Sequence, residues 1–178
     1  MTMPPGFRLE AETPSDAPDI EALLDRAFGA DRHAKRSYAY RRGIDSIAAL
    51  RLVARDPARR LVGTLRFWPV GVDAGDRGGS RPALLLGPLA VEPELKGQGV
   101  GRALMADGLA RAAALGHGLV LLVGDIAYYG QFGFAPAAPL GLFMPGEQPH
   151  RLLWHALHSG ADPGPGALVC AAVADAPA

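Results

Sequence analysis

Apolar and polar residues repeat along this chain with two periods, which predict strands in some stretches and helices in others. Phe7 to Glu12 alternates apolar and polar side chains and so predicts a half-buried strand. Thr13 to Asp16 is typical of a helix start, and Gly29 is suited to end that helix. Between them, apolar residues recur at helical spacing: Ile20, Leu23, Leu24, Ala27 and Phe28. This pattern predicts an amphipathic helix that covers a sheet.

Two further β-like runs follow and predict a hairpin. They extend from Leu50 to Arg55 and from Leu61 to Val72, and Asp56 to Arg60 joins them with turn chemistry. Residues 71–82 are then polar and glycine-rich, which predicts a loop that contributes little to the core.

The stretch from Leu84 to Phe134 organises the rest of the chain. It opens with the apolar run LLLGPLAVEP, in which Gly87-Pro88 predicts a β-bulge, because proline cannot donate a hydrogen bond to a sheet. A helix is predicted from Gly99 to Leu115. The run LVLLVGD is apolar throughout, as a strand covered on both faces should be, and predicts a parallel partner reached by a right-handed crossover. With a last strand from Ala167 to Val173, these elements predict an α/β fold with a mixed sheet.

Length and composition narrow the class of protein. The 178 residues fit a single domain, residues 1–178, with a sizeable core. Eighteen basic residues balance eighteen acidic ones, so no global field recruits nucleic acid or an anionic membrane. No apolar run is long enough to span a membrane. A single cysteine and the absence of a charged-then-apolar leader predict a cytoplasmic location.

The glycine-rich turn between the strand and the helix predicts an anion-binding site. Gly97, Gly99 and Gly101 carry no Cβ, so the backbone can adopt positive φ and approach a ligand closely. The helix adds about half a positive charge at its first turn, from Gly99 to Arg102, where the N–H groups lack intrahelical partners. This geometry suits a pyrophosphate. A P-loop is excluded because no Lys-Ser/Thr follows, and a dinucleotide fingerprint lacks its third glycine at Leu104, although Asp125 does end the next strand.

Lys96-Gly97-Gln98-Gly99-Val100-Gly101 resembles the Gln/Arg-x-x-Gly-x-Gly/Ala signature of the GCN5-related N-acetyltransferases, the GNAT family, which bind acetyl-coenzyme A. Lysine stands in the first place of the signature, which keeps the positive charge of the arginine form but not its planar fork. The segments LLLGPLAVEPELKGQGVG and VLLVGDIAYYGQFGFAPA look like the YhbS-like branch of that family. A looser match covers nearly the whole chain.

The resemblance implies the GNAT fold, a single domain with a mixed, splayed central sheet flanked by helices. It also implies that the main chain of Leu89, Ala90 and Val91 meets the acetyl-pantetheine arm in a wedge beside the bulge. The implied cofactor-binding set is completed by the turn and the first turn of the helix: Lys96, Gly97, Gln98, Gly99, Val100, Gly101 and Arg102. Acetyl-CoA is the implied co-substrate, and no metal is expected.

An aromatic cluster supplies the expected catalytic side chain. The family pattern Tyr-x-x-x-Gly-Phe falls on Tyr129 and Gly133-Phe134, so the resemblance places Tyr129 near the cofactor sulfur, and Tyr128 is expected to be a core residue with a wet hydroxyl. A phenol there can stabilise the departing thiolate. Full proton transfer from a phenol of ordinary pKa is uphill by roughly 2 kcal/mol, so hydrogen-bond donation matters as much as acid catalysis.

The acceptor amine must also lose a proton, and the sequence leaves the base open. Glu92, Asp125 and His33 are candidates, as is a chain of waters. Glu92 is also explained as the polar residue of a Val-Glu-Pro turn, and Asp125 as the cap of the next helix. Oxyanion stabilisation is expected from a backbone N–H on the bulged strand.

Three other features have plainer interpretations. A basic segment is expected to be a solvated face, although the resemblance allows it to select an acceptor bearing a carboxylate or phosphate: Arg32, His33, Lys35, Arg36, Arg41 and Arg42, around Tyr38 and Tyr40. Cys170, in ALVCAAV, predicts a buried, inert thiol rather than a nucleophile. HRLLWHALH predicts a short amphipathic helix with solvated histidines, because its spacing is not that of a metal site.

The sequence therefore predicts an N-acetyltransferase that passes acetyl from acetyl-CoA directly to an amine, since no activated nucleophile is present. Two alternatives stay open: a catalytically silent CoA-binding regulator of the same fold, and an acyltransferase for longer chains. The acceptor is unidentified and the oligomeric state is open, a homodimer included.

Overall fold

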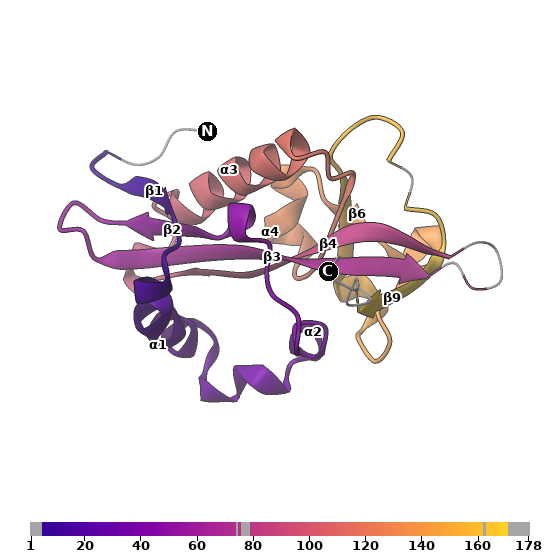
Figure 1. The fold of residues 1–178 in the computed structure, drawn as a ribbon, viewed down its shortest axis with the longest axis horizontal. Coiled ribbons are helices and arrows are strands. Elements are labelled where there is room, and N and C mark those ends of the chain that lie inside the picture. Colours follow the sequence, from indigo (N-terminus) through magenta and orange to yellow (C-terminus); the bar gives the residue numbers. More distant parts are fainter. Residues whose placement is uncertain (1–4, 74, 76–78, 162, 171–178) are drawn as a thin grey trace, which may run out of the picture. The chain divides into compact units, whose positions relative to one another are not determined.

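The computed structural model describes residues 5–73, 75, 79–161 and 163–170. Its helices are α1 (Ala17–Phe28), α2 (Arg36–Ala39), α3 (Val100–Ala114) and α4 (Ile126–Tyr129), and short 3₁₀ turns connect several elements (Figure 1). Its longer strands are β1 (Arg8–Ala11), β2 (Leu52–Arg55), β3 (Leu61–Asp73), β4 (Ser80–Val91), β5 (Leu119–Val123), β8 (Leu152–Ala156) and β9 (Gly166–Cys170). Two two-residue strands, β6 (Ala135–Pro136) and β7 (Leu142–Phe143), complete the sheet.

The strands form one mixed sheet in the order β1-β2-β3-β4-β5-β8-β6, which confirms the predicted α/β class. β4 and β5 run parallel, with Leu84 opposite Val120 and Leu85 opposite Leu121, as the crossover through α3 requires. β1–β2, β2–β3 and β5–β8 are antiparallel. The sheet is accordingly mixed, and helices flank it.

The chain folds as two compact units. The first contains the described residues up to Lys35 together with Ser46–Phe67 and Leu86–Leu115. The second contains Arg36–Asp45, Trp68–Leu85 and the described residues from Gly116 onward. The long strands β3 and β4 therefore each contribute residues to both units.

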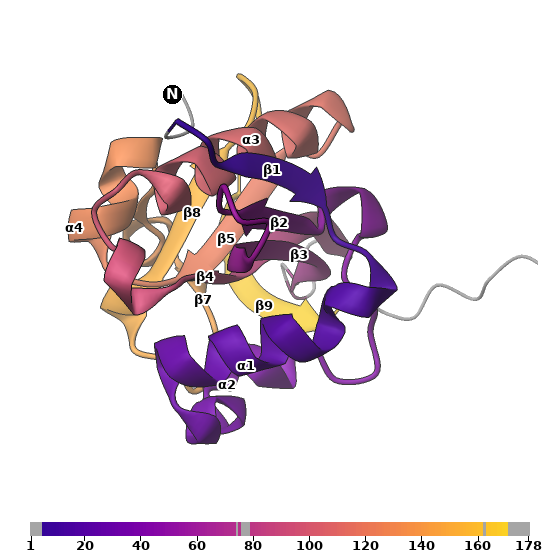
Figure 2. The same cartoon turned by 90° about the vertical axis from the view of Figure 1, so that its left-hand side faces the viewer.

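In the first unit, α1 and α3 cover opposite faces of β1, β2 and the start of β3 (Figures 1 and 2). The helix start predicted at Thr13 is confirmed: the Thr13 N–H donates to Asp16 at 2.8 Å before α1 begins. Gly29 ends α1 with φ 86°. The buried face of α1 packs against two strands and the end of β4 in a single cluster: Ile20, Leu23, Leu24, Val53, Leu61 and Ala90.

The other helix of this unit, α3, lies directly on β3. Gly108 is buried in the middle of α3, and a Cβ built there would lie 2.6 Å from Leu65 Cδ2 and 2.9 Å from Phe67 Cε2. The helix and the strand thus approach more closely than a side chain at residue 108 allows. On the polar side of α3, Arg111 Nε forms an ion pair with Asp107 Oδ2 at 2.7 Å.

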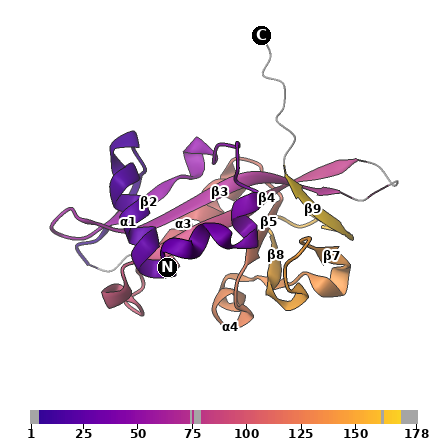
Figure 3. The same cartoon turned by 90° about the horizontal axis from the view of Figure 1, so that it is seen from below.

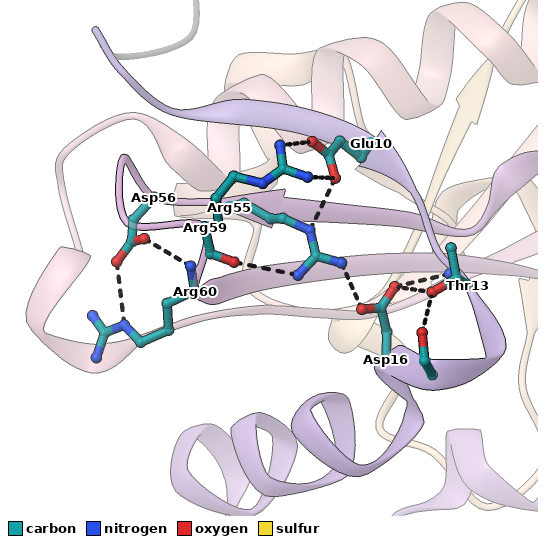
Figure 4. Close-up of polar contacts among 8 residues, drawn as sticks. Glu10, Thr13, Asp16, Arg55, Asp56, Arg59 and Arg60 are labelled. Atoms are coloured by element: carbon teal, nitrogen blue, oxygen red, sulfur yellow. Dashed lines mark hydrogen bonds and ion pairs between the residues drawn. The ribbon is translucent and has the colours of Figure 1, made fainter.

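An ion-pair network ties β1 and the start of α1 to the β2–β3 hairpin (Figure 4). Arg55 occupies its centre: Nε donates to Glu10 at 2.9 Å and Nη2 to Asp16 at 2.5 Å. Arg59 donates to the other oxygen of Glu10 at 2.6 Å, and Arg60 pairs with Asp56 within the turn. The predicted hairpin turn from Asp56 to Arg60 is therefore present and fixed by its own side chains.

The second unit is built around β5, whose partners are β4 on one side and β8 on the other. β6 pairs with β8, while β7 pairs in parallel with β9, which also runs antiparallel to the end of β3 (Figure 3). Among the described residues, one buried cluster forms its core: Tyr40, Val70, Val72, Ala83, Leu85, Leu119, Leu121, Ala137, Leu142, Met144, Leu152 and Leu168. The Tyr40 hydroxyl donates to the Leu168 carbonyl at 3.2 Å.

The predicted helix in HRLLWHALH is wrong. Leu152 to Ala156 form strand β8, in register with all of β5 from Val123 to Leu119. A short apolar run has no decisive period, and here the partner strand determines its structure. The predicted loop 71–82 is also too long, because β3 continues to Asp73 and β4 begins at Ser80. Of the predicted last strand, residues 171–173 lie outside the described residues.

Candidate active site

The glycine-rich turn leads into the N-terminus of α3. Gly97 and Gly99 have φ 82° and 91°, and Gly99 is the N-cap of α3 in a left-handed conformation that favours glycine. No side chain caps this end of the helix. The first backbone bond within α3 runs from the Ala103 N–H to the Gly99 carbonyl at 3.0 Å, so the N–H groups of residues 100–102 have no intrahelical acceptor. Gly101 lies inside α3 and does not use positive φ, contrary to its predicted role.

The side chains of the predicted cofactor-binding turn take three different positions. Lys96 and Arg102 are exposed, so their charges flank the turn in contact with solvent. Val100 is completely buried and packs in the core. The Gln98 amide is turned back and donates to the Glu94 carbonyl at 3.3 Å. The backbone is therefore the main recognition element that this turn offers to an anion.

The strand before the turn, β4, runs from Ser80 to Val91 and contains Gly87-Pro88. The Gly87-Pro88 peptide is cis and Gly87 has φ 131°, and the β-bulge predicted at this point stays a prediction. Pairing with β5 covers Leu84 and Leu85, on the N-terminal side of that point. Beyond it, Leu89 and Val91 are half-buried, whereas Ala90 is buried against α1 in the first unit.

Tyr129 ends the short helix α4 in the second unit. Asp125 caps α4, accepting the Ala127 N–H at 3.0 Å, as its position predicts. The Tyr129 ring meets Tyr128 edge-on at 4.9 Å between centroids and Phe134 at 6.0 Å. Tyr128 itself is 38% exposed and not a core residue, contrary to expectation.

Residues 9–137 match the family model of the acetyltransferase (GNAT) domain, which is more than half of the chain. This chain belongs to the GNAT family. It is 37% identical over 156 residues to the uncharacterized N-acetyltransferase YhbS of Escherichia coli K12, covering 84% of this chain and 90% of YhbS. It is also 32% identical to the uncharacterized N-acetyltransferase YjhQ of the same organism, over 83% of this chain and 82% of YjhQ.

Solved structures of GNAT proteins agree with the fold. The crystal structure of E. coli YhbS in complex with CoA has a TM-score of 0.76 and 33% identity, covering 91% of this chain and 88% of that chain. A GNAT acetyltransferase from Brucella melitensis in complex with acetyl-CoA has a TM-score of 0.67 and 25% identity, covering 92% and 94%. The GNAT resemblance seen in the sequence is confirmed, and the chain is an acetyl-CoA-dependent acyltransferase.

Burial sets the acid–base state of Tyr129. It raises the pKa of Tyr129 to about 12, the neighbouring Tyr128 phenol adds to the shift, and Arg151 opposes it. Tyr129 therefore stays protonated throughout the physiological range and can act only as a hydrogen-bond donor or an acid. Against a thiol of pKa about 8.5, full proton transfer from this phenol is uphill by about 5 kcal/mol, more than for an exposed tyrosine.

The three candidate bases of this GNAT protein differ in what their side chains contact. Glu92 is 3% exposed, and both of its oxygens accept from Arg26 of α1, at 2.6 and 3.2 Å. Asp125 is engaged in capping α4, and His33 is exposed on a 3₁₀ turn. The Arg26–Glu92 pair joins the end of β4 to α1, which favours a structural role for Glu92.

The basic segment is only partly a solvated face. Arg32 is 3% exposed and pairs with Glu21 at 2.5 Å and Asp25 at 2.9 Å, so its charge is balanced by α1. Lys35 is exposed, with Nζ 4.6 Å from the centroid of the Phe28 ring. Cys170 lies on β9 and is exposed, so the prediction of a buried thiol is wrong.

Sequence reasoning missed two residues of this region. Arg26, which holds Glu92, gave no signal beyond its place on a helix. Gly124 lies directly before the Asp125 cap, and nothing in the sequence indicates that a Cβ there would meet the Tyr129 ring. Within the described residues, no three His, Cys, Asp or Glu side chains are grouped to hold a metal. The helices described are likewise too short or too polar to cross a membrane.

Proposed function

We propose that this GNAT protein transfers the acetyl group of acetyl-CoA directly to an acceptor amine in a ternary complex. The observation that carries the proposal is the uncapped N-terminus of the fifteen-residue helix α3, entered through Gly97 and Gly99 in left-handed conformations. Unpaired N–H groups and the helix dipole together favour an anion of pyrophosphate size. The CoA in the YhbS crystal structure and the acetyl-CoA in the Brucella structure support this assignment.

In this proposal, different groups of the chain bind the pyrophosphate and orient the acetyl-pantetheine arm. Backbone N–H groups of the turn and of residues 100–102 bind the pyrophosphate, except that of Gln98, which donates to the Leu95 carbonyl at 3.2 Å. Lys96 and Arg102 add positive charge at the rim. The main chain of Leu89, Ala90 and Val91 orients the acetyl-pantetheine arm. Acetyl-CoA supplies the thioester, and no residue of the chain is acylated.

Tyr129 is proposed to donate a hydrogen bond to the sulfur as the C–S bond breaks and the C–N bond forms. Its raised pKa means that the proton stays on the phenol while it stabilises the thiolate, and the amine proton leaves through solvent. A donor of this kind contributes to the transition state more than to cofactor binding.

Calorimetric titration with acetyl-CoA and CoA, followed by a thiol-release assay over an amine library, tests the proposal. Gly99→Val should weaken CoA binding at least tenfold, because a β-branched residue is costly in the left-handed conformation and blocks the N–H groups. Tyr129→Phe should lower kcat with little change in CoA affinity. Cys170→Ser should leave both unchanged, whereas a large loss of turnover would indicate acyl transfer through the thiol.

The outcomes separate the alternatives. Tight CoA binding without thiol release on any amine favours a silent regulator, and faster release from longer acyl-CoAs favours a different acyl group. Unchanged CoA binding in Gly99→Val would remove the loop assignment. A single domain over residues 1–178, a cytoplasmic location and a homodimer remain predictions, the first supported by the two strands that each run through both units.

A further inference from the structure

The ring of Tyr129 rests on the backbone of Gly124. A Cβ built on Gly124 would lie 2.7 Å from Tyr129 Cδ2 and closer still to Cε2. Carbon atoms in a protein interior pack best at about 3.5 to 4.0 Å, so no side chain fits between the ring and the strand end. Gly124 is buried, and it is not among the glycines with positive φ, so its backbone conformation alone permits other residues. The Tyr129 ring makes the closest of these contacts, and Leu122 Cδ1 would lie 2.9 Å from the same Cβ.

The backbone under the ring cannot easily move away. The Gly124 N–H donates to the Arg151 carbonyl at 2.9 Å, and Val123 before it pairs with Leu152 of β8. This anchors the end of β5 on the side of β8. A shift of Gly124 away from the ring would stretch the hydrogen bond and the strand pairing together.

The ring is also held from the side of its own helix. The Tyr129 N–H donates to the Asp125 carbonyl at 3.0 Å, and the Asp125 side chain caps the same turn. Tyr128 meets the ring at an interplanar angle of 88°, and Phe134 at 67°. With the turn capped and aromatic rings on the flanks, the distance between the ring and the strand is set by residue 124.

We propose that Gly124 is a positioning residue that fixes the height of the Tyr129 phenol above the end of β5. The inference rests on the proposed function of Tyr129 and adds the residue through which that function is placed. A methyl group at residue 124 would push the ring outward by roughly 1 Å, a displacement that can cost about 100-fold in rate when a catalytic group is misplaced.

The kinetic test is a double-mutant cycle on Gly124→Ala and Tyr129→Phe, assayed by thiol release with acetyl-CoA and the best amine of the library. Gly124→Ala should lower kcat about 10- to 100-fold and leave the KM for acetyl-CoA within about twofold. In the Tyr129→Phe background it should lower kcat no further, because the hydroxyl is already absent. Gly130→Ala is the matched control, since its Cβ would lie 3.7 Å from Ile126 Cδ1 in ordinary contact, and it should keep its rate.

A second readout does not depend on turnover. In the NMR spectrum of the CoA-saturated protein, a Gly124 Hα should be shifted upfield by the aromatic ring and should lose that shift in Tyr129→Leu. An unshifted Gly124 Hα in the wild-type protein would overturn the proposal, whether or not the Gly124→Ala variant folds. So would an equal loss of rate from Gly124→Ala in the wild-type and Tyr129→Phe backgrounds. A wild-type rate in Tyr129→Phe would instead contradict the proposed function of Tyr129. In that case the Hα shift would still report the contact between Gly124 and the ring.

Discussion

Replacing Gly108 with alanine sets two known effects against each other at the contact between α3 and β3. In a helix interior, alanine is favoured over glycine by about 1 kcal/mol. Against this, the new methyl would lie 2.6 Å from Leu65 and 2.9 Å from Phe67, and both of these side chains are completely buried. Overpacking of this kind costs about 1 to 3 kcal/mol. Gly108→Ala should therefore lower the free energy of unfolding by about 1 kcal/mol, where helix propensity alone would raise it.

Urea unfolding followed by far-UV circular dichroism and tryptophan fluorescence measures this change. Both tryptophans, Trp68 and Trp154, belong to the second unit, so coincident transitions would also show that both units unfold together. Ala110→Gly, at an exposed position of the same helix, calibrates the propensity effect and should cost about 1 kcal/mol.

The decisive comparison uses a background in which the space has been opened. Leu65→Ala alone should cost about 2 to 5 kcal/mol, but it removes the nearest obstacle to the methyl. In that background Gly108→Ala should be less destabilising than in the wild-type protein, with a coupling energy of about 1 kcal/mol between the two sites, although Phe67 still lies 2.9 Å from the methyl. A Gly108→Ala variant that is more stable than the wild-type protein by the full propensity value would refute the close packing of α3 on β3.

Two further predictions concern buried carboxylates. Burial alone would raise the pKa of Asp16, but hydrogen bonds from the Thr13 N–H and from Arg55 outweigh it and hold the pKa below its ordinary value. Asp16→Asn should therefore lower the free energy of unfolding by roughly 3 kcal/mol at pH 7. This difference in stability should persist above pH 4 and disappear at lower pH, as the wild-type carboxylate is protonated. Thermal melts that show a constant difference down to pH 2 would contradict this. Glu92→Gln should lower the free energy of unfolding by only about 1 kcal/mol, because its partner Arg26 is half exposed. The variant should keep the wild-type pH profile of kcat. Loss of the acidic limb of that profile would identify Glu92 as the base.

Local signals in the sequence predicted most of the elements that frame the site. The Thr13 to Asp16 start and the Gly29 end fixed the limits of α1 to within a residue or two, because capping is decided by neighbouring groups. The turn from Asp56 to Arg60 did the same for the hairpin. The Gly97–Gly99 turn was predictable because only glycine readily adopts its conformation.

What the sequence did not predict depends on distant partners. Leu152 to Ala156 became a strand because β5 pairs with every residue of it. Arg32 is buried because two carboxylates from α1 meet it, a fact invisible in a run of basic residues. Arg26 contacts Glu92, 66 residues away in the chain, and no local pattern reports this pair. The role proposed for Gly124 depends on how the Tyr129 ring folds back onto the strand end, which the sequence does not show either.

The way the chain passes between the two units has a consequence for how the protein is made. Neither unit is a continuous segment of the chain. The first unit consists of three stretches, the last of which ends at Leu115, and stretches of the second unit lie between them and after them in the sequence. During synthesis the first unit cannot close until α3 has left the ribosome, and β4 and the end of β3 must then wait for β5 and β9. A premature stop after α3 would consequently leave strand edges unpaired, so truncated products should aggregate rather than persist as a working half.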